Sequence, residues 1–424
     1  MNPQPSARST SPMNSPAIAS SPKRTSAGVG YSENSNSREA GLEAARAAMA
    51  AAGVTSCDLV LLFATDKHDP AVLQDAVRSV VGRVPRIVGG SAMGVITHDR
   101  MGYEGQQVGV AVISSDSAKI DIFAAPGLAD GEYAVGCALG AQLKSASFDG
   151  EPNLLLLYDI VKRRMSEGLS LNMAAPLLAG LGDALGQWPR TAGVGMMGSL
   201  QWNPGFQWVD DRIEHHNAVA VVFHGGVRMD TCIMHGCKPS SGYHTITKSD
   251  GNVVLELDGE RMQDVIARLT GGDESDWKDY PLFITLGINN GDKFGEYREE
   301  DYAVRLCMDV DRERGGLVFF GDDLVTGTVV QLMRRSIGFD YIGQRAEELL
   351  AGLGQRTPFL ALYIDCAGRA AAFAGTDREE AEEVQRVIGA RMPLLGWYGG
   401  CEIAKAGPVM QSHNWTGVLS ILSV

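Results

Sequence analysis

The sequence predicts an α/β fold of mixed α+β character, in which duplicated α/β units form mixed sheets covered by helices. Short apolar runs such as residues 59–63 alternate with longer helical patterns such as residues 70–81, which is the order typical of α/β proteins. Other predicted strands are separated only by turn residues, as at residues 114–117, so hairpins also occur. Both kinds of connection together favour mixed sheets with helices on their outer faces.

The first elements carry recognisable end signals. Asn36 and Glu39 resemble a capping box at the start of an Ala-rich helix, and Gly53 is placed to end that helix. After it we expect a buried strand at residues 59–63, a helix at 70–81, a short strand at 86–89, and longer strands at 107–113 and 119–123.

The same order then recurs along the chain. Residues 154–158 match the first buried strand, and residues 185–198 align with residues 81–94 through shared proline, arginine, methionine and glycine positions. A fainter copy of this pattern lies at residues 389–396. The N-terminal half is therefore predicted to be a duplicated α/β unit, and the C-terminal half carries a weaker echo of it.

A hairpin signal marks the middle of the chain. Asp250 and Gly251 lie between two alternating strands, and we place a domain boundary near them. The division is a disordered Ser/Pro-rich tail at residues 1–28, an N-terminal domain at 29–240 and a C-terminal domain at 241–424. Further elements expected downstream are helices at 259–269, 326–352 and 377–388, and strands at 282–286, 302–308 and 316–320.

Composition excludes several classes of function. The 424 residues carry a formal net charge of −14, which disfavours binding to nucleic acid and to anionic membrane surfaces. No apolar stretch approaches the roughly 20 residues of a membrane span. Seven cysteines, an odd number spread over a long chain, are typical of reduced thiols. We therefore expect a cytoplasmic protein.

Two motifs suggest chemistry but fail on their context. Residues 193–198 match the dinucleotide-binding glycine pattern, yet the following residues, Ser199 to Pro204, cannot begin the required helix, so a tight glycine turn is predicted instead. Cys232, His235 and Cys237 resemble metal ligands. Because side chains alternate faces along a strand, Cys232 would point away from the other two, and no metal site is predicted.

Three polar clusters near the C-terminus are the best candidate site. Cys366 and Arg369 follow an apolar run, Glu402 follows another after a glycine pair, and His413 and Asn414 precede the apolar end of the chain. Each cluster lies where a predicted strand meets a loop, and ligand crevices favour strand ends. The three clusters can therefore converge at one sheet edge.

The residue types leave three interpretations open. In a recognition site, Arg369 would bind a carboxylate, and Glu402 and Asn414 would accept an amino group or hydroxyl. In a catalytic site, Cys366 would be the nucleophile, His413 its base and Glu402 the orienting group. In a purely structural role, Cys366 would be a small buried side chain and Arg369 and Glu402 would form an ion pair.

The chain resembles the FIST family, the F-box and intracellular signal transduction domains of sensory proteins. Residues 359–369 resemble its apolar strand ending in Cys-x-Gly-Arg, residues 396–403 its Gly-Phe-Tyr-x-x-Gly-Glu-Ile segment, and residues 413–416 its His-Asn-x-Thr. Residues 236–239 match the family's Gly-Cys-Arg/Lys-Pro. One departure is Cys401, which stands where the family has a glycine and would add a side chain to the site.

The resemblance implies a bacterial sensor of a small ligand, with a small polar metabolite such as an amino acid as the leading candidate. Because the sequence carries no kinase or cyclase module, a separate signalling protein is implied as partner, either a histidine kinase or a cyclic-di-GMP enzyme. The alternatives are a haem-binding nitric-oxide sensor, with His413, His235 or His244 as axial ligand, and a Cys-dependent hydrolase or transferase. The ligand-binding residues expected are Cys366, Arg369, Tyr398, Cys401, Glu402, His413 and Asn414.

Overall fold

The computed structural model describes residues 25–165, 168–272, 280–336 and 338–424. Most of the tail expected at residues 1–28 lies outside this part of the chain, but its last residues belong to strand β1 (Thr25–Ser32). Gly28 allows this strand to lie directly against the helix that follows it. A Cβ atom there would lie 2.3 Å from the carbonyl oxygen of Ala48, so the helix backbone packs directly onto the strand.

The first unit follows the predicted order. Asn36 accepts hydrogen bonds from the backbone of Arg38 and Glu39 at the start of helix α1, and Gly53 ends that helix with a φ of 66°. The strands of its sheet lie in the order β1-β6-β2-β3, with only β2 and β3 parallel. The elements are α1 (Ser37–Ala52), β2 (Leu59–Ala64), α2 (Pro70–Val81), β3 (Arg86–Ser91) and β6 (Val108–Ser115).

The predicted duplication is in fact a triplication. The second unit has the sheet order β7-β14-β8-β11 and the third β15-β28-β24-β25, and in each the last two strands are the parallel pair. The second unit comprises β7 (Lys119–Pro126), α3 (Glu132–Ser145), β8 (Asn153–Asp159), α4 (Ala174–Leu185), β11 (Arg190–Met196) and β14 (Asn217–His224). The third comprises β15 (Arg228–Met234), α6 (Asp340–Gly352), β24 (Pro358–Cys366), α8 (Ala381–Val384) with a π-helical turn (Gln385–Gly389), β25 (Leu394–Gly399) and β28 (Gly417–Ser423).

Each unit gives a hairpin to the sheet of another unit. The first unit's hairpin pairs with β25 of the third sheet, the third unit's with β11 of the second, and the second unit's with β3 of the first. Every main sheet therefore holds six strands from two units, and the units interlock. The hairpins are β4 (Gly94–Thr97) with β5 (Met101–Tyr103), β26 (Cys401–Ala406) with β27 (Val409–His413), and β12 (Gln207–Val209) with β13 (Arg212–Glu214).

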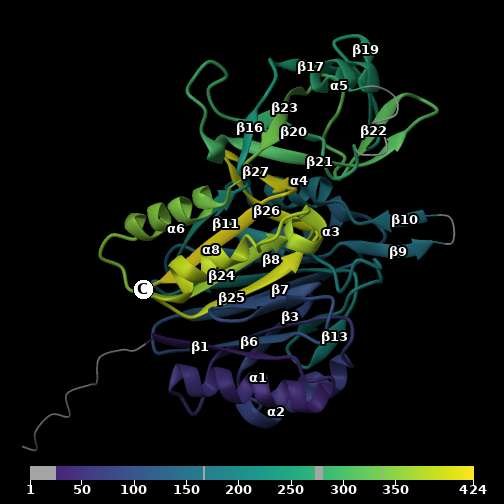
Figure 1. The fold of residues 1–424 in the computed structure, drawn as a ribbon. Coiled ribbons are helices and arrows are strands. Elements are labelled where there is room, and N and C mark those ends of the chain that lie inside the picture. Colours follow the sequence, from purple (N-terminus) through teal and green to yellow (C-terminus); the bar gives the residue numbers. More distant parts are fainter. Residues whose placement is uncertain (1–24, 166–167, 273–279, 337) are drawn as a thin grey trace, which may run out of the picture.

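A small closed barrel is inserted between β15 and α6. Its strands run in the order β20-β21-β22-β18-β17-β23, and β23 pairs back onto β20. Figure 1 shows the barrel at the top, above the three sheets, with α1 and α2 at the bottom. The additional strand β16 pairs with β23. The elements are β16 (Cys237–Pro239), β17 (His244–Asp250), β18 (Val253–Leu257), β19 (Glu260–Arg261), α5 (Met262–Thr270), β20 (Thr285–Asn289), β21 (Tyr302–Asp311), β22 (Gly316–Phe319) and β23 (Val329–Arg335).

The barrel corrects one element of the sequence analysis. The helix expected at residues 326–352 is two elements, strand β23 and helix α6. Val330 and Leu332 alternate into the barrel core, so this segment follows the strand period rather than the helical one. The division predicted between residues 240 and 241 falls between β16 and β17 of this same sheet. As a statement about separate domains, it stays a prediction.

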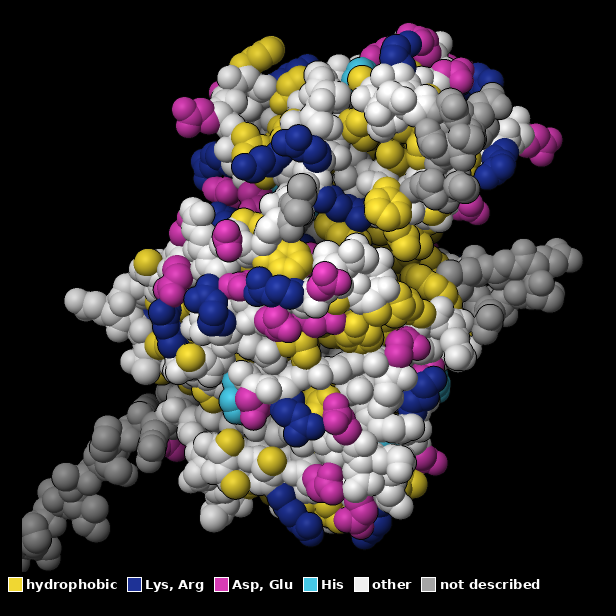
Figure 2. Space-filling model, viewed as in Figure 1, with side chains coloured by type: hydrophobic (Ala, Val, Ile, Leu, Met, Phe, Trp, Pro, Cys, Tyr) yellow, Lys and Arg dark blue, Asp and Glu magenta, His cyan; other side chains and the backbone are white. Residues whose placement is uncertain are grey.

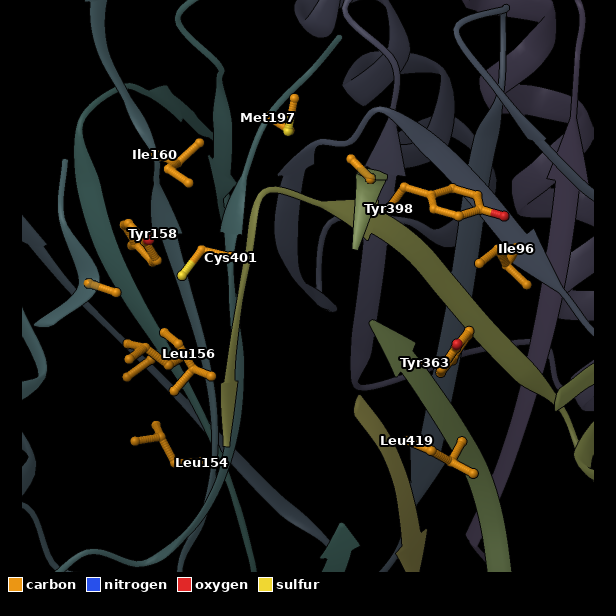
Figure 3. Packing of buried hydrophobic residues seen from close by; sticks show 14 of the residues in the cluster. Ile96, Leu154, Leu156, Tyr158, Ile160, Met197, Tyr363, Tyr398, Cys401 and Leu419 are labelled. Carbon is orange, nitrogen blue, oxygen red and sulfur yellow. The ribbon is translucent and has the colours of Figure 1, made fainter. Parts of the chain in front are cut away.

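The inner faces of the three main sheets share one core. Leu61, Leu157 and Leu362, one from each sheet, belong to a single buried cluster. Phe63 stacks on Trp397 at 3.9 Å between ring centroids, which joins the first sheet to the third. The outer faces of the sheets pack against the helices, and Figure 3 shows part of this second layer. Mixed sheets covered by helices are thus confirmed.

Candidate functional site

The three C-terminal clusters do converge. Strand β24 ends at Cys366, its parallel neighbour β25 ends at Gly399, and the chain turns at Gly400 into β26. Glu402 of β26 lies opposite His413 of β27 in the antiparallel register. The clusters therefore meet at the carboxyl ends of the strands, beneath the inserted barrel.

Arg369 is bound on every side by the protein itself. The guanidinium is fully buried and donates to the carbonyl oxygens of Met234 (2.6 Å) and Trp415 (3.2 Å). Its Nε atom lies 3.1 Å from Asp365 Oδ1, and its Nη2 atom binds Glu380. These partners come from four different segments, so Arg369 holds the strand ends together, and its charge is already paired with Asp365 and Glu380.

Glu402 is a buried carboxyl without a hydrogen-bond partner among the described residues. Neither Oε1 nor Oε2 is bound there, and the side chain is fully inaccessible to solvent. Burial, followed by the nearby charge of Asp365, raises the pKa of Glu402 well above its usual value. Burial also raises the pKa of Asp365, to about 7. Burial therefore favours the protonated form of Glu402.

His413 and Asn414 connect the body to the barrel. His413 is buried beside the Arg305 guanidinium, and burial followed by that charge lowers its pKa to about 3. Its Nε2 atom lies 3.2 Å from the carbonyl oxygen of Ala404, so the neutral ring donates to this oxygen. The Asn414 side chain accepts from the backbone of Leu306 in the barrel at 3.2 Å.

Tyr398 and Cys401 face away from each other. Tyr398 is buried edge-on against Tyr103, with centroids 5.4 Å apart. Figure 3 shows Cys401 directed toward Tyr158 instead. Its thiol lines a small cleft that Phe320 also borders, and burial followed by the charge of Glu402 raises its pKa to about 12. The side chain at the family's glycine position therefore enters this neighbouring cleft.

An apolar cavity of about 270 Å³ lies between the strand ends and the barrel. Of the predicted site residues, Cys366 and Asn414 line it, whereas Arg369, Tyr398, Glu402 and His413 do not. Figure 2 shows hydrophobic side chains gathered in a band between the upper and lower parts of the molecule. The cavity is lined by Met197, Leu200, Trp202, Leu282, Leu306, Met308, Phe320, Cys366, Ala367, Gly368, Phe373, Gly399, Gly400 and Asn414.

The barrel and loop residues of this cavity were absent from the sequence prediction. Leu306, Met308 and Phe320 come from the barrel, and Leu200 and Trp202 from the loop after β11. Isolated apolar residues in strands and loops give no local signal, because only the insertion of the barrel brings them to the strand ends. The one usable hint was the short Trp-Asn-Pro-Gly loop that begins at Trp202.

The glycine segment at residues 193–198 is not the predicted turn. Its first four residues belong to strand β11, which pairs with β8 on one side and β26 on the other, and Gly198 lies in a bend after the strand. Close packing explains the glycines, since a Cβ atom on Gly193 would lie 2.4 Å from the carbonyl oxygen of Leu156, and one on Gly195 would lie 2.7 Å from the hydroxyl of Tyr158.

The residues present do not fit a haem. His413, His235 and His244 line neither the cavity between the barrel and the strand ends nor the small cleft beside Cys401. His235 is buried, with Nε2 3.1 Å from the carbonyl oxygen of Glu299 and Nδ1 accepting from the backbone of Cys237. His244 binds the Asp258 carboxylate at 2.7 Å. None of these three imidazoles therefore lines the cavity where a haem was expected.

The geometry also disfavours thiolate chemistry. Burial, followed by the neighbouring Glu402, raises the pKa of Cys366 well above its usual value. His413 donates its Nε2 proton to the backbone at Ala404, so its hydrogen bond serves the protein fold. A neutral thiol at an apolar cavity suits binding of an uncharged molecule better than nucleophilic attack.

Comparison with protein families agrees with this architecture. A FIST N domain matches residues 58–260 and a FIST C domain matches residues 261–405. A comparison with curated proteins found no match. Within the described part of the chain, no helix has the length and apolar character needed to cross a membrane. FIST domains are associated with sensing in signal transduction. The chain belongs to the FIST family, with both of its domains present.

Proposed function

We propose that this protein is a sensor that binds a small, uncharged and largely apolar molecule in the cavity between the barrel and the strand ends. The observation that carries the proposal is the chemistry of the lining. None of the fourteen described residues that line the cavity is charged, and Trp202, Phe320 and Phe373 supply three aromatic rings. Concave, mostly apolar sites with few polar groups are typical of small-molecule binding.

This lining favours an uncharged ligand over an amino acid. A free amino acid carries an ammonium and a carboxylate, and both lose water on binding unless opposite charges replace it. Arg369 and Glu402 are the charged residues that the sequence predicted for this role, but neither lines the cavity, and Arg369 is bound by the protein. Asn414 is the only lining side chain with an amide and can orient one polar group of the ligand.

The position of the cavity supports a sensory role. A ligand there touches the barrel through Met308 and Phe320 and the body through Cys366 and Phe373. Binding therefore changes the free energy of the contact between the two parts, which is what a ligand-driven signal requires. The receiver would be a separate protein, with a histidine kinase or a cyclic-di-GMP enzyme as the classes that the family resemblance suggests.

A thermal-shift screen with two matched variants tests the proposal. Phe320→Ala removes an aromatic wall of the cavity, whereas Phe294→Ala removes a ring of the same barrel that is 90% exposed. We expect neutral aromatic and aliphatic compounds to raise the melting temperature of wild type and Phe294→Ala, and to do so much less in Phe320→Ala. Equal shifts in both variants, or shifts produced only by charged amino acids, would overturn the proposal.

A further inference from the structure

A second groove, of about 690 Å³, lies in the second unit, at the amino-terminal ends of the parallel strands β8 and β11. Leu154 of β8 and Val222 of β14 form its floor, so the groove reaches the sheet itself between the ends of α3 and α4. Phe148 and Trp188 line it as aromatic walls, and both are partly exposed. The groove thus has an apolar floor and is open to solvent.

Positive side chains also line this groove, although the chain as a whole carries a charge of −14. Lys144, Arg190 and Lys405 line it, against one acidic residue, Glu151. Across the described residues, neither Lys144 nor Lys405 forms an ion pair. Arg190 lies 3.5 Å from Asp230, but that carboxylate binds Arg228 more closely, at 2.7 Å.

The threefold repeat supplies an internal comparison for Arg190. In the first unit the corresponding residue is Arg86, since both arginines follow a proline and begin the third strand. Arg86 forms a bidentate ion pair with Asp210, at 2.5 and 2.8 Å. Asp210 belongs to the hairpin that the second unit gives to the first sheet.

The residue at the place of Asp210 in the second sheet is Lys405. Val209 pairs with Val88, and its backbone neighbour Asp210 donates to the carbonyl oxygen of Ile87. In the second sheet Ile403 pairs with Gly193, which puts Lys405 at the position of Asp210 in the same antiparallel register. The first unit therefore has an Arg–Asp ion pair at this position, whereas the second unit has two cations, Arg190 and Lys405, that line a groove.

We propose that this groove binds an amphiphilic carboxylate. Its anionic head would lie between Arg190 and Lys405, where the first unit places the Asp210 carboxylate, and its apolar or aromatic body would lie against Trp188 and the Leu154 floor. A bound carboxylate would pair with Arg190 as the Asp210 carboxylate pairs with Arg86 in the first unit. An apolar body buries the floor that the helix ends leave open.

Binding of 4-phenylbutyrate and of its uncharged analogue 4-phenylbutanol to the full chain tests this site. Lys405→Asp recreates the acid of the first unit and should pair with Arg190, so we expect it to weaken 4-phenylbutyrate at least tenfold. Lys238→Asp makes the same change at an exposed strand position of the barrel and should leave the affinity unchanged. The cavity between the barrel and the strand ends, called the junction cavity from here on, is also proposed to bind apolar molecules. Phe320→Ala, which alters that cavity, is therefore included and should retain the binding of the acid.

Each result decides the question. A tenfold loss in Lys405→Asp only, with weaker binding of the alcohol at the groove, supports the site. Equal affinity in Lys405→Asp and wild type overturns it, as does the absence of acid binding at millimolar concentration. Binding of an acidic peptide of alternating Glu and Leu residues without binding of the small acid would also overturn it, and would identify the groove as a protein-docking surface. Failure here leaves the junction cavity unaffected, because the two sites share no described residue.

Discussion

Replacing Glu402 by Gln should change how the stability of this protein depends on pH. The carboxyl is fully buried, and neither oxygen has a hydrogen-bond partner among the described residues. Its pKa in the folded state is raised well above the model-peptide value of 4.5 by burial and by Asp365. Glutamine has nearly the same shape and cannot ionise, so the substitution removes the titration with little change in packing.

The direction of the effect follows from proton linkage. Above pH 4.5 the unfolded chain releases the Glu402 proton, whereas the folded protein keeps it. The unfolded state then binds fewer protons, so the free energy of unfolding falls as pH rises, by about 1.4 kcal/mol per pH unit for one group. From pH 5 to pH 7, Glu402→Gln should therefore become progressively more stable relative to wild type, by at most about 1.4 kcal/mol for each pH unit. Asp365, with a pKa of about 7, keeps some pH dependence in both proteins.

Urea unfolding at pH 5, 6 and 7 measures this difference directly. The control is Glu347→Gln, since Glu347 is exposed, binds Arg391 at 2.7 Å and has a pKa lowered by that hydrogen bond. A lowered pKa gives stability that is lost as pH falls, so any effect of the control has the opposite sign. Stability curves for Glu402→Gln and wild type that stay parallel from pH 5 to pH 7 would show that Glu402 is ionised in the folded protein, and the reasoning would fail.

Two further predictions concern residues that the sequence placed in the site. Arg369→Met should lower the free energy of unfolding by about 3–5 kcal/mol in urea titrations, because it leaves Asp365 and Glu380 buried without their cation. A loss below 1 kcal/mol would mean that the arginine does not hold the strand ends together. The Cys366 thiol should react with a disulfide reagent at pH 8 far more slowly in folded wild type than in urea, and Cys366→Ala should not change the fast phase of the folded protein, because the raised pKa suppresses the thiolate. A fast phase that disappears in Cys366→Ala would contradict this.

Most of the fold could be predicted from local patterns. The helix at Pro70–Val81 matches the expected residues, and the cap at Asn36 and the end at Gly53 follow rules that act within a few residues. The third unit was visible only as an echo, because its barrel and its longer crossover segments separate the matching pieces. The exchange of hairpins could not be predicted, since pairing between β25 and β4 joins residues about 300 positions apart without a local signature.

The convergence of the three C-terminal clusters could be predicted, but the partners of their side chains could not. The positions of Cys366, Glu402 and Asn414 at predicted strand ends and loops indicated that they converge, and the strand pairing of the structure brings these segments together. Residue type alone could not show that the Arg369 guanidinium binds groups of the protein itself. It also could not show that Leu306 and Phe320, from a distant insertion, would line the cavity. Burial and partners decide between an arginine that binds a ligand and one that holds a fold, and both depend on tertiary packing.

The occupied junction cavity is the central claim, and native mass spectrometry of protein purified from its own cells tests it most directly. Met308 lines the cavity and is only partly buried, so Met308→Trp should fill the space, whereas Phe294→Trp changes an exposed ring of the same barrel. We expect a small uncharged molecule to accompany wild type and Phe294→Trp and to be absent from Met308→Trp. A bound molecule that persists in Met308→Trp, or one that carries the mass of haem, would contradict the account.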